Sequence, residues 1–98
     1  MVHHIVMWKL RPEADGRSKA ENAKIIQQRL SALPPKIDCI QSLRVGVNEN
    51  GGAWDVVLVT TFQTAADLAA YDSHPDHQAV KRLIQTAAAD RACIDFTD

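Results

Sequence analysis

The chain has 98 residues, of which 46% are hydrophobic and 23% charged, with a formal net charge of -1. This length predicts one domain, residues 1–98, with a modest hydrophobic core. The charge balance provides no basic excess to attract nucleic acid or an anionic membrane. No apolar run approaches the roughly 20 residues of a membrane-spanning helix. We therefore expect neither nucleic acid nor a membrane as a partner.

The opening segment MVHHIVMWKL is typical of a strand and not of a targeting signal. It lacks the charged n-region and the cleavage site of a signal peptide. A cytoplasmic location is therefore the default expectation. Two cysteines, Cys39 and Cys93, are too few and too far apart in the chain for a disulfide framework. A reducing compartment would keep both as free thiols.

Residues 2–10 alternate between two sets of side chains. One set contains His4, Val6, Trp8 and Leu10, and the other contains His3, Ile5, Met7 and Lys9. Both sets carry large apolar residues, which predicts a strand covered on both sides. A polar loop over residues 11–16 follows. Ser18 and Glu21 have the spacing of a capping box, and a helical apolar stripe follows until Leu33 and Pro34 end the helix.

Two more strands are predicted over residues 37–48 and 54–62, joined by a hairpin turn at Asn50-Gly51-Gly52. Thr64 can cap a second helical segment, and residues 91–96 form a last short strand. The order βαββαβ predicts an α+β, ferredoxin-like fold with a four-stranded antiparallel sheet. In that order the second and fourth strands occupy opposite edges. Cys39 and Cys93 should therefore lie far beyond the ~7 Å limit for a disulfide.

The two helices of such a fold cover only one face of the sheet. The first and third strands are apolar on both faces, so the other face should expose a large apolar surface, which marks an interaction site. We expect a homodimer through this open sheet face, in which two sheets facing each other form an α+β barrel. A bound ligand or the C-terminal tail is the alternative cover for the open face.

The stretch LAAYDSHPDHQAV places Tyr71, His74 and His77 at intervals of three residues. Pro75 disfavours helix at His74 and suits the first position of a new helix, which predicts a break followed by a helix to about Asp90. His77 shares the apolar face of that helix. Titratable groups that converge on an apolar surface suit a small acid–base site.

A purely structural role for the same residues is favoured over a catalytic one. A histidine on an apolar face is more commonly a hydrogen-bonded core residue than a catalyst, and Tyr71 can be a core aromatic whose hydroxyl finds a partner. His74 and His77 have a spacing that metal ligands can show. No further cysteine or histidine ligands accompany them in this stretch, however, so no metal site is expected.

The segments HHIVMWKL, AAYDSHPDHQAV and ACIDF, with the hairpin between them, resemble the stress-responsive A/B barrel (Dabb) family over essentially the whole chain. The run Y-x-x-H-P-x-H is the most specific element. The resemblance implies a dimeric α+β barrel with a pocket between sheet and helices, and most members have no assigned reaction. One plant member closes a linear polyketide by aldol condensation. Its catalytic residues correspond to Tyr71 and His77, a further histidine to His74, and a first-strand histidine to His3 or His4.

Two functions follow from this resemblance. The chain is a stress-related dimer that binds a small apolar molecule or a protein in a pocket lined by Tyr71 and His77, or it is a cofactor-independent enzyme. The enzyme would act on a polyketide-like or other β-dicarbonyl compound through an enolate. His77 would remove a proton, Tyr71 would donate to the enolate oxygen, and His4 or His3 would orient the substrate. A cofactor-free monooxygenase is a less favoured alternative, and no haem signature or other cofactor is expected.

The segment QAVKRLIQTAAAD is smaller and more charged than its counterpart in the plant cyclase, so the same substrate is not expected. Enzyme and binding protein differ in one structural requirement. For catalysis, Tyr71 and His77 must both line a cavity.

Overall fold

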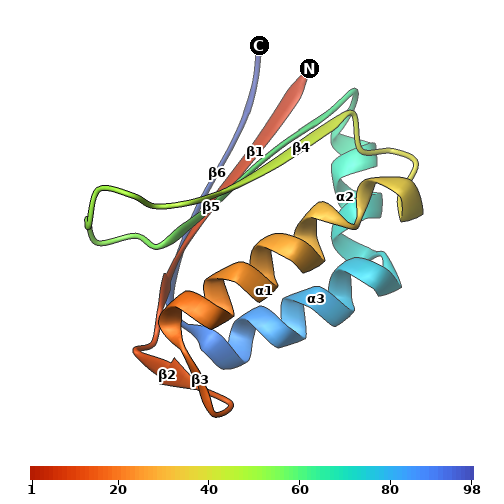
Figure 1. Ribbon diagram of the computed structural model, residues 1–98. Coiled ribbons are helices and arrows are strands. Elements are labelled where there is room, and N and C mark those ends of the chain that lie inside the picture. The colour runs from red at the N-terminus through yellow and green to blue at the C-terminus, as the bar shows by residue number, and fades with distance from the viewer.

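The computed structural model describes all residues 1–98 as a four-stranded antiparallel sheet with the helices on one face (Figure 1). The elements in chain order are β1 (Val2–Leu10), β2 (Glu13–Ala14), β3 (Arg17–Ser18), α1 (Lys19–Ser31), the 3-10 helix η1 (Pro34–Lys36), β4 (Ser42–Val47), β5 (Val56–Phe62), α2 (Ala65–Ser73), α3 (Pro75–Ala87) and β6 (Ala88–Thr97). The strand order in the large sheet is β4-β5-β1-β6. The predicted ferredoxin-like α+β fold is confirmed.

The start of α1 has the predicted capping box. The Ser18 hydroxyl accepts the Glu21 backbone N–H at 3.2 Å, and the Glu21 carboxylate accepts the Ser18 backbone N–H at 3.2 Å. Each bond satisfies a backbone donor that has no partner inside the helix. The helix buries Ile26 and Leu30, each 1% exposed, against the sheet. It ends shortly before Pro34, as the sequence predicts.

The predicted polar loop over residues 11–16 is wrong in part, because its second half enters the small β2–β3 hairpin. Ala14 pairs with Arg17, so the turn consists of Asp15 and Gly16. Their φ angles of 53° and 72° are both left-handed, as a two-residue type I′ turn requires. The Asp-Gly pair is itself a hairpin signal, and it was available in the sequence.

The second strand of the large sheet starts at Ser42 and not at residue 37. Two consecutive prolines begin η1 instead, and Ile37, 2% exposed, packs into the core. The first bond to β5 comes from the Gln41 backbone N–H to the Thr61 carbonyl at 2.9 Å. At the other end of the chain, α3 stops at Ala87 and β6 begins at once, so the predicted helix is about three residues too long.

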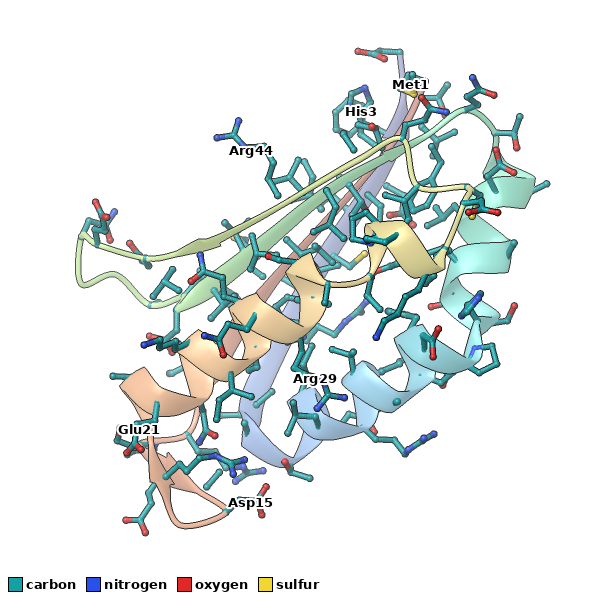
Figure 2. All side chains as sticks on the ribbon, turned by 45° about the vertical axis from the view of Figure 1, so that its right-hand side comes forward. Met1, His3, Asp15, Glu21, Arg29 and Arg44 are labelled. Atoms are coloured by element: carbon teal, nitrogen blue, oxygen red, sulfur yellow. The ribbon has the colours of Figure 1, made fainter.

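The two faces of the sheet differ in their cover. On β1, Val6 is 1% exposed on the helix side, whereas His3 and its neighbours on the opposite face are only half-buried. Figure 2 shows His3 and Arg44 projecting away from the helices. On β6, Ile94 is 65% and Phe96 is 45% exposed on this same open face. One apolar face of the sheet therefore lacks cover, as the sequence predicts.

The two cysteines lie at opposite sides of the sheet. Cys39 precedes the edge strand β4, and Cys93 lies on the other edge strand, β6. Both are free thiols, as expected. None of the helices combines the length and the apolar character that crossing a membrane requires.

Candidate functional site

The break between α2 and α3 is where the sequence predicts it. His74 has an extended backbone, with φ -64° and ψ 136°, and Pro75 is the first residue of α3. The His74 ring Nδ1 accepts the backbone N–H of Asp76 at 3.1 Å, so this histidine acts as the N-cap of α3. His74 does not line the cavity described below. Its position explains the start of α3 and places it outside the group of converging side chains.

A cavity lies between α3 and the helix-facing side of β1, β5 and β6. The space open to the centre of a water molecule is about 60 Å³. Its apolar walls come from β1, β5 and the helices, and its polar groups are His4, Asp72, His77, Lys81, Gln85 and Arg91. An apolar pocket with a few converging polar groups is a common form of small-molecule site.

His77 points into this cavity from the first turn of α3. Its ring Nδ1 lies 3.1 Å from the backbone carbonyl oxygen of Asp72. A carbonyl can only accept, so Nδ1 carries the proton and Nε2 keeps a lone pair in the neutral ring. Burial lowers the pKa of His77 below its ordinary value; the bond to the Asp72 carbonyl and the Asp72 charge oppose this effect, and Lys81 adds to it. His77 is therefore neutral and basic at Nε2 at about pH 7.

Tyr71 lies next to His77 but does not line the cavity, which corrects the expectation that both residues do. Its side chain is 0% exposed. The ring lies 4.2 Å from the His77 ring and 5.2 Å from the Phe62 ring, measured between centroids. Because Tyr71 is on the last turn of α2, above Phe62 of β5, packing against the sheet draws it into the core. Its hydroxyl is buried without a hydrogen-bond partner, and burial raises its pKa above the ordinary value.

The alternation of β1 determines which of the first two histidines reaches the cavity. His4 lies on the helix side and lines it, and its Nδ1 is 2.5 Å from the Asp95 carboxylate. His3 lies on the open face, 2.9 Å from the Asp98 carboxylate, and its ring stacks on Phe96 at 4.6 Å. The structure therefore brings His4 and His77 together and leaves His3 on the other side of the sheet.

A wider hollow of about 430 Å³ adjoins the cavity at the β6 edge. His4, Asp72 and Arg91 line both spaces. The hollow adds Cys93 and Asp95 of β6, whose side chains share the helix-facing side with Arg91. Burial and the neighbouring Asp95 charge raise the pKa of the Cys93 thiol. Sequence reasoning did not select these residues, although their alternation with Ala92, Ile94 and Phe96 was a usable signal.

The family model of the stress-responsive A/B barrel domain (Dabb) matches residues 2–98. The chain belongs to the Dabb family. This match agrees with the family resemblance of the sequence and covers almost the whole chain. Membership of this family does not assign a reaction to the chain.

Solved structures of similar chains support the same fold. A dimeric protein of unknown function from Bacteroides fragilis is 33% identical with a TM-score of 0.87, over 99% of this chain and 95% of that chain. A dimeric ferredoxin-like protein of unknown function from Thermobifida fusca is 24% identical with a TM-score of 0.83, over 99% and 90%. A Dabb family protein from Mesorhizobium loti is 17% identical with a TM-score of 0.78, over 99% and 95%. None of the curated proteins matches the chain.

Proposed function

We propose that the cavity binds a small carbonyl compound and that Nε2 of His77 takes a proton from a carbon between two carbonyl groups. The observation that carries this proposal is the bond from His77 Nδ1 to the Asp72 carbonyl, 3.1 Å long. It assigns the ring proton to Nδ1 and leaves Nε2 as the base. The lowered pKa keeps that base unprotonated at about pH 7.

The enolate formed by this step needs a hydrogen-bond donor for its oxygen. Tyr71 is our candidate, because its hydroxyl is the buried side-chain polar atom that lacks a partner. Its raised pKa keeps the hydroxyl protonated and therefore able to donate. The hydroxyl is covered in the ligand-free chain, so side chains of the cavity wall must shift before it reaches a ligand.

His4 has a supporting role in this proposal. The Asp95 carboxylate, 2.5 Å from Nδ1, orients the His4 ring and directs its other nitrogen away from β6. Since His4 lines both the cavity and the hollow, it can orient a substrate that spans the two. The narrow cavity would hold the reacting carbon, and the wider hollow would hold the remainder of the molecule.

We also propose that the chain acts as a homodimer through the open sheet face. The similar chains from Bacteroides fragilis and Thermobifida fusca are dimeric. On this chain, Ile94 and Phe96 leave a contiguous apolar strip exposed on that face, beside half-buried residues of β1 and β5. A second copy would bury this surface and close the barrel.

The test for proton abstraction is hydrogen–deuterium exchange at the activated methylene of a panel of β-keto esters, followed by proton NMR in D₂O. Wild type should accelerate exchange over buffer, and His77→Ala should lower the enzymatic rate by about 10²–10⁴. His74→Asn is the matched control, because asparagine keeps a helix cap and His74 lies outside the cavity. Equal exchange with and without wild-type protein would contradict the proposal for this substrate class.

The second candidate is a binding protein without catalysis, and the complete burial of Tyr71 favours it. In that case the same β-keto esters shift the NMR signals of cavity residues without exchanging faster. His77→Ala would then lower thermal stability and ligand affinity and change no rate.

A further inference from the structure

A cluster of three side chains that could hold a metal ion lies in the hollow at the β6 edge. His4 Nδ1, Cys93 Sγ and an Asp95 carboxylate oxygen all lie within 4.8 Å of one another. Asp95 is directly opposite His4 in the β1–β6 pair, and Cys93 is two residues from Asp95 on the same face. Two hydrogen-bonded strands, and no loop, hold the three donor atoms on one side of the sheet.

The spacing of these atoms resembles the spacing around a tetrahedral zinc ion. Cys93 Sγ lies 3.7 Å from His4 Nδ1 and 3.7 Å from Asp95 Oδ1. Zinc bond lengths and tetrahedral angles place a thiolate sulfur about 3.5–3.6 Å from a nitrogen or oxygen ligand. The separation of 2.5 Å between His4 and Asp95 would have to increase to roughly 3.3 Å. The Asp95 side chain is 49% exposed, which leaves its carboxylate room to turn.

We propose that His4, Cys93 and Asp95 bind one divalent transition-metal ion such as Zn²⁺, with a fourth position open to the hollow. Nitrogen, thiolate and carboxylate are the ligand types that zinc takes in proteins, and three protein ligands with an open position are usual for its catalytic sites. One thiolate and one carboxylate balance the charge of the ion. On binding, the Cys93 thiol releases its proton to solvent. The His4 ring gives up the Nδ1 proton that faces the Asp95 carboxylate in the free chain and takes one up on Nε2, so the ring stays neutral while Nδ1 binds the ion.

This inference does not rest on the proposed function, because neither the proposed base His77 nor the proposed donor Tyr71 is a ligand. The two proposals share His4, whose Nδ1 would bind the ion while its Nε2 would face the substrate. The chain positions of the ligands explain why the sequence predicts no such site. His4 and Cys93 are 89 residues apart, so no local ligand spacing exists. The expectation of no metal site concerned His74 and His77, which are not part of this cluster.

The test uses the full chain, reduced and stripped with a chelator, and Co²⁺ as the probe at about pH 7.5, where the ion must displace the proton of the Cys93 thiol on binding. Wild type should bind one Co²⁺ per chain with a thiolate-to-cobalt charge-transfer band, and Zn²⁺ should displace it. Cys93→Ser should abolish the band, and Asp95→Asn should weaken binding by about ten-fold or more. Circular dichroism without metal establishes that each variant is folded; Cys93→Ala replaces Cys93→Ser if the latter is not.

Two matched controls come from the chain itself. Cys39→Ser removes the other thiol, which bonds the Asp67 carbonyl at 3.3 Å. Asp98→Asn changes another His–Asp pair, His3 with Asp98, which lies on the open face and is not part of the His4–Cys93–Asp95 cluster. Both variants should keep the band and the affinity of wild type. The proposal is overturned if wild type shows no thiolate band, if Cys93→Ser retains it, or if Asp98→Asn weakens binding as much as Asp95→Asn.

Discussion

The imidazole Nδ1 of His77 donates a hydrogen bond to the backbone carbonyl of Asp72 across the break between α2 and α3, over 3.1 Å. The bond ties the first turn of one helix to the last turn of the other. It also determines which ring nitrogen is basic. The break is therefore more than a change of chain direction, because the geometry of the proposed base depends on it.

Acidification should reduce the stability of the folded chain through His77. Burial lowers its folded-state pKa below the ordinary 6.5, so the unfolded chain binds the proton more tightly. The stabilising contribution is complete above the unfolded-state pKa and is lost as the pH falls below about 6.5 toward the folded-state value. Thermal melts between about pH 8 and pH 5 should show a decline in Tm that is smaller in His77→Gln. Carboxylates and the other histidines titrate in both chains and cancel in the difference.

The exchange rate should depend on pH in the same range. Only neutral His77 can accept the substrate proton, so the rate per enzyme should rise with pH and reach half of its maximum below about pH 6.5. A half-maximal rate above that pH would show that the titrating group is not a histidine with a lowered pKa. In the thermal melts, a difference in stability between wild type and His77→Gln that stays constant with pH would contradict the argument that burial lowers the pKa of His77.

Tyr71→Phe should affect stability and catalysis in opposite directions. The Tyr71 hydroxyl is buried without a partner, and removing an unsatisfied group should raise the unfolding free energy by about 1 kcal/mol. The same change should slow exchange, because the proposed enolate donor is lost. Thr60→Val is the control, since the Thr60 hydroxyl donates to the His4 carbonyl at 3.1 Å and its loss should cost about 1–3 kcal/mol. Chemical denaturation measures the unfolding free energy of both variants. A loss of stability in Tyr71→Phe would mean that the Tyr71 hydroxyl has a hydrogen-bond partner.

Local sequence patterns predicted those features that depend on neighbours in the chain. Alternation over residues 2–10 places His4 and Val6 on one face, and the structure agrees. The proline at position 75 predicts the helix break, and the i, i+3 spacing places His77 on the inner side of α3. The start of β4 was missed because the apolar residue Ile37 belongs to the core under η1 and not to a strand.

Features that depend on long-range packing were not predictable. The depth of Tyr71 is determined by Phe62 and His77, which cover its ring from β5 and α3. The His4–Asp95 pair joins residues 91 positions apart, and its partner could be identified only once β1 and β6 were placed side by side. A sequence pattern assigns a side chain to a face, but it does not determine whether that face meets a cavity or another side chain.

Dimer formation should depend on the exposed apolar strip of β6. Ile94→Lys places a charge on the open face, where Ile94 is 65% exposed, and should give monomers in sedimentation velocity at micromolar concentration. An interface of at least ~1,600 Å² in total is expected for wild type. Gln28→Lys adds the same charge on the outer side of α1 and should leave the dimer intact. A wild-type monomer, or a dimer that survives Ile94→Lys, would contradict the assignment of the interface to this face.

Pro75 and the His74 side chain both hold the break between α2 and α3, and variants can separate their effects. Pro75 removes a backbone N–H and disfavours helix at His74, while the His74 ring caps α3 by accepting the Asp76 N–H at 3.1 Å. Pro75→Ala alone should cost roughly 0.4–1 kcal/mol, because the unfolded chain becomes more flexible while the His74 side chain still caps α3. His74→Ala should cost about 1 kcal/mol through loss of the cap. The double variant allows α2 and α3 to merge, so the Asp72 carbonyl would bond within the helix and release His77.

Two measurements would detect a merger of α2 and α3 in the double variant. The double variant should lose more stability in denaturant unfolding than the sum of the single variants, since neighbouring changes in one structural unit are not additive. Its His77 should also titrate nearer to the ordinary value in a histidine NMR titration, because the ring is no longer held in the buried position that lowers its pKa. If Pro75→Ala alone shifts the His77 titration as far as the double variant does, the proline determines the geometry without help from the His74 cap.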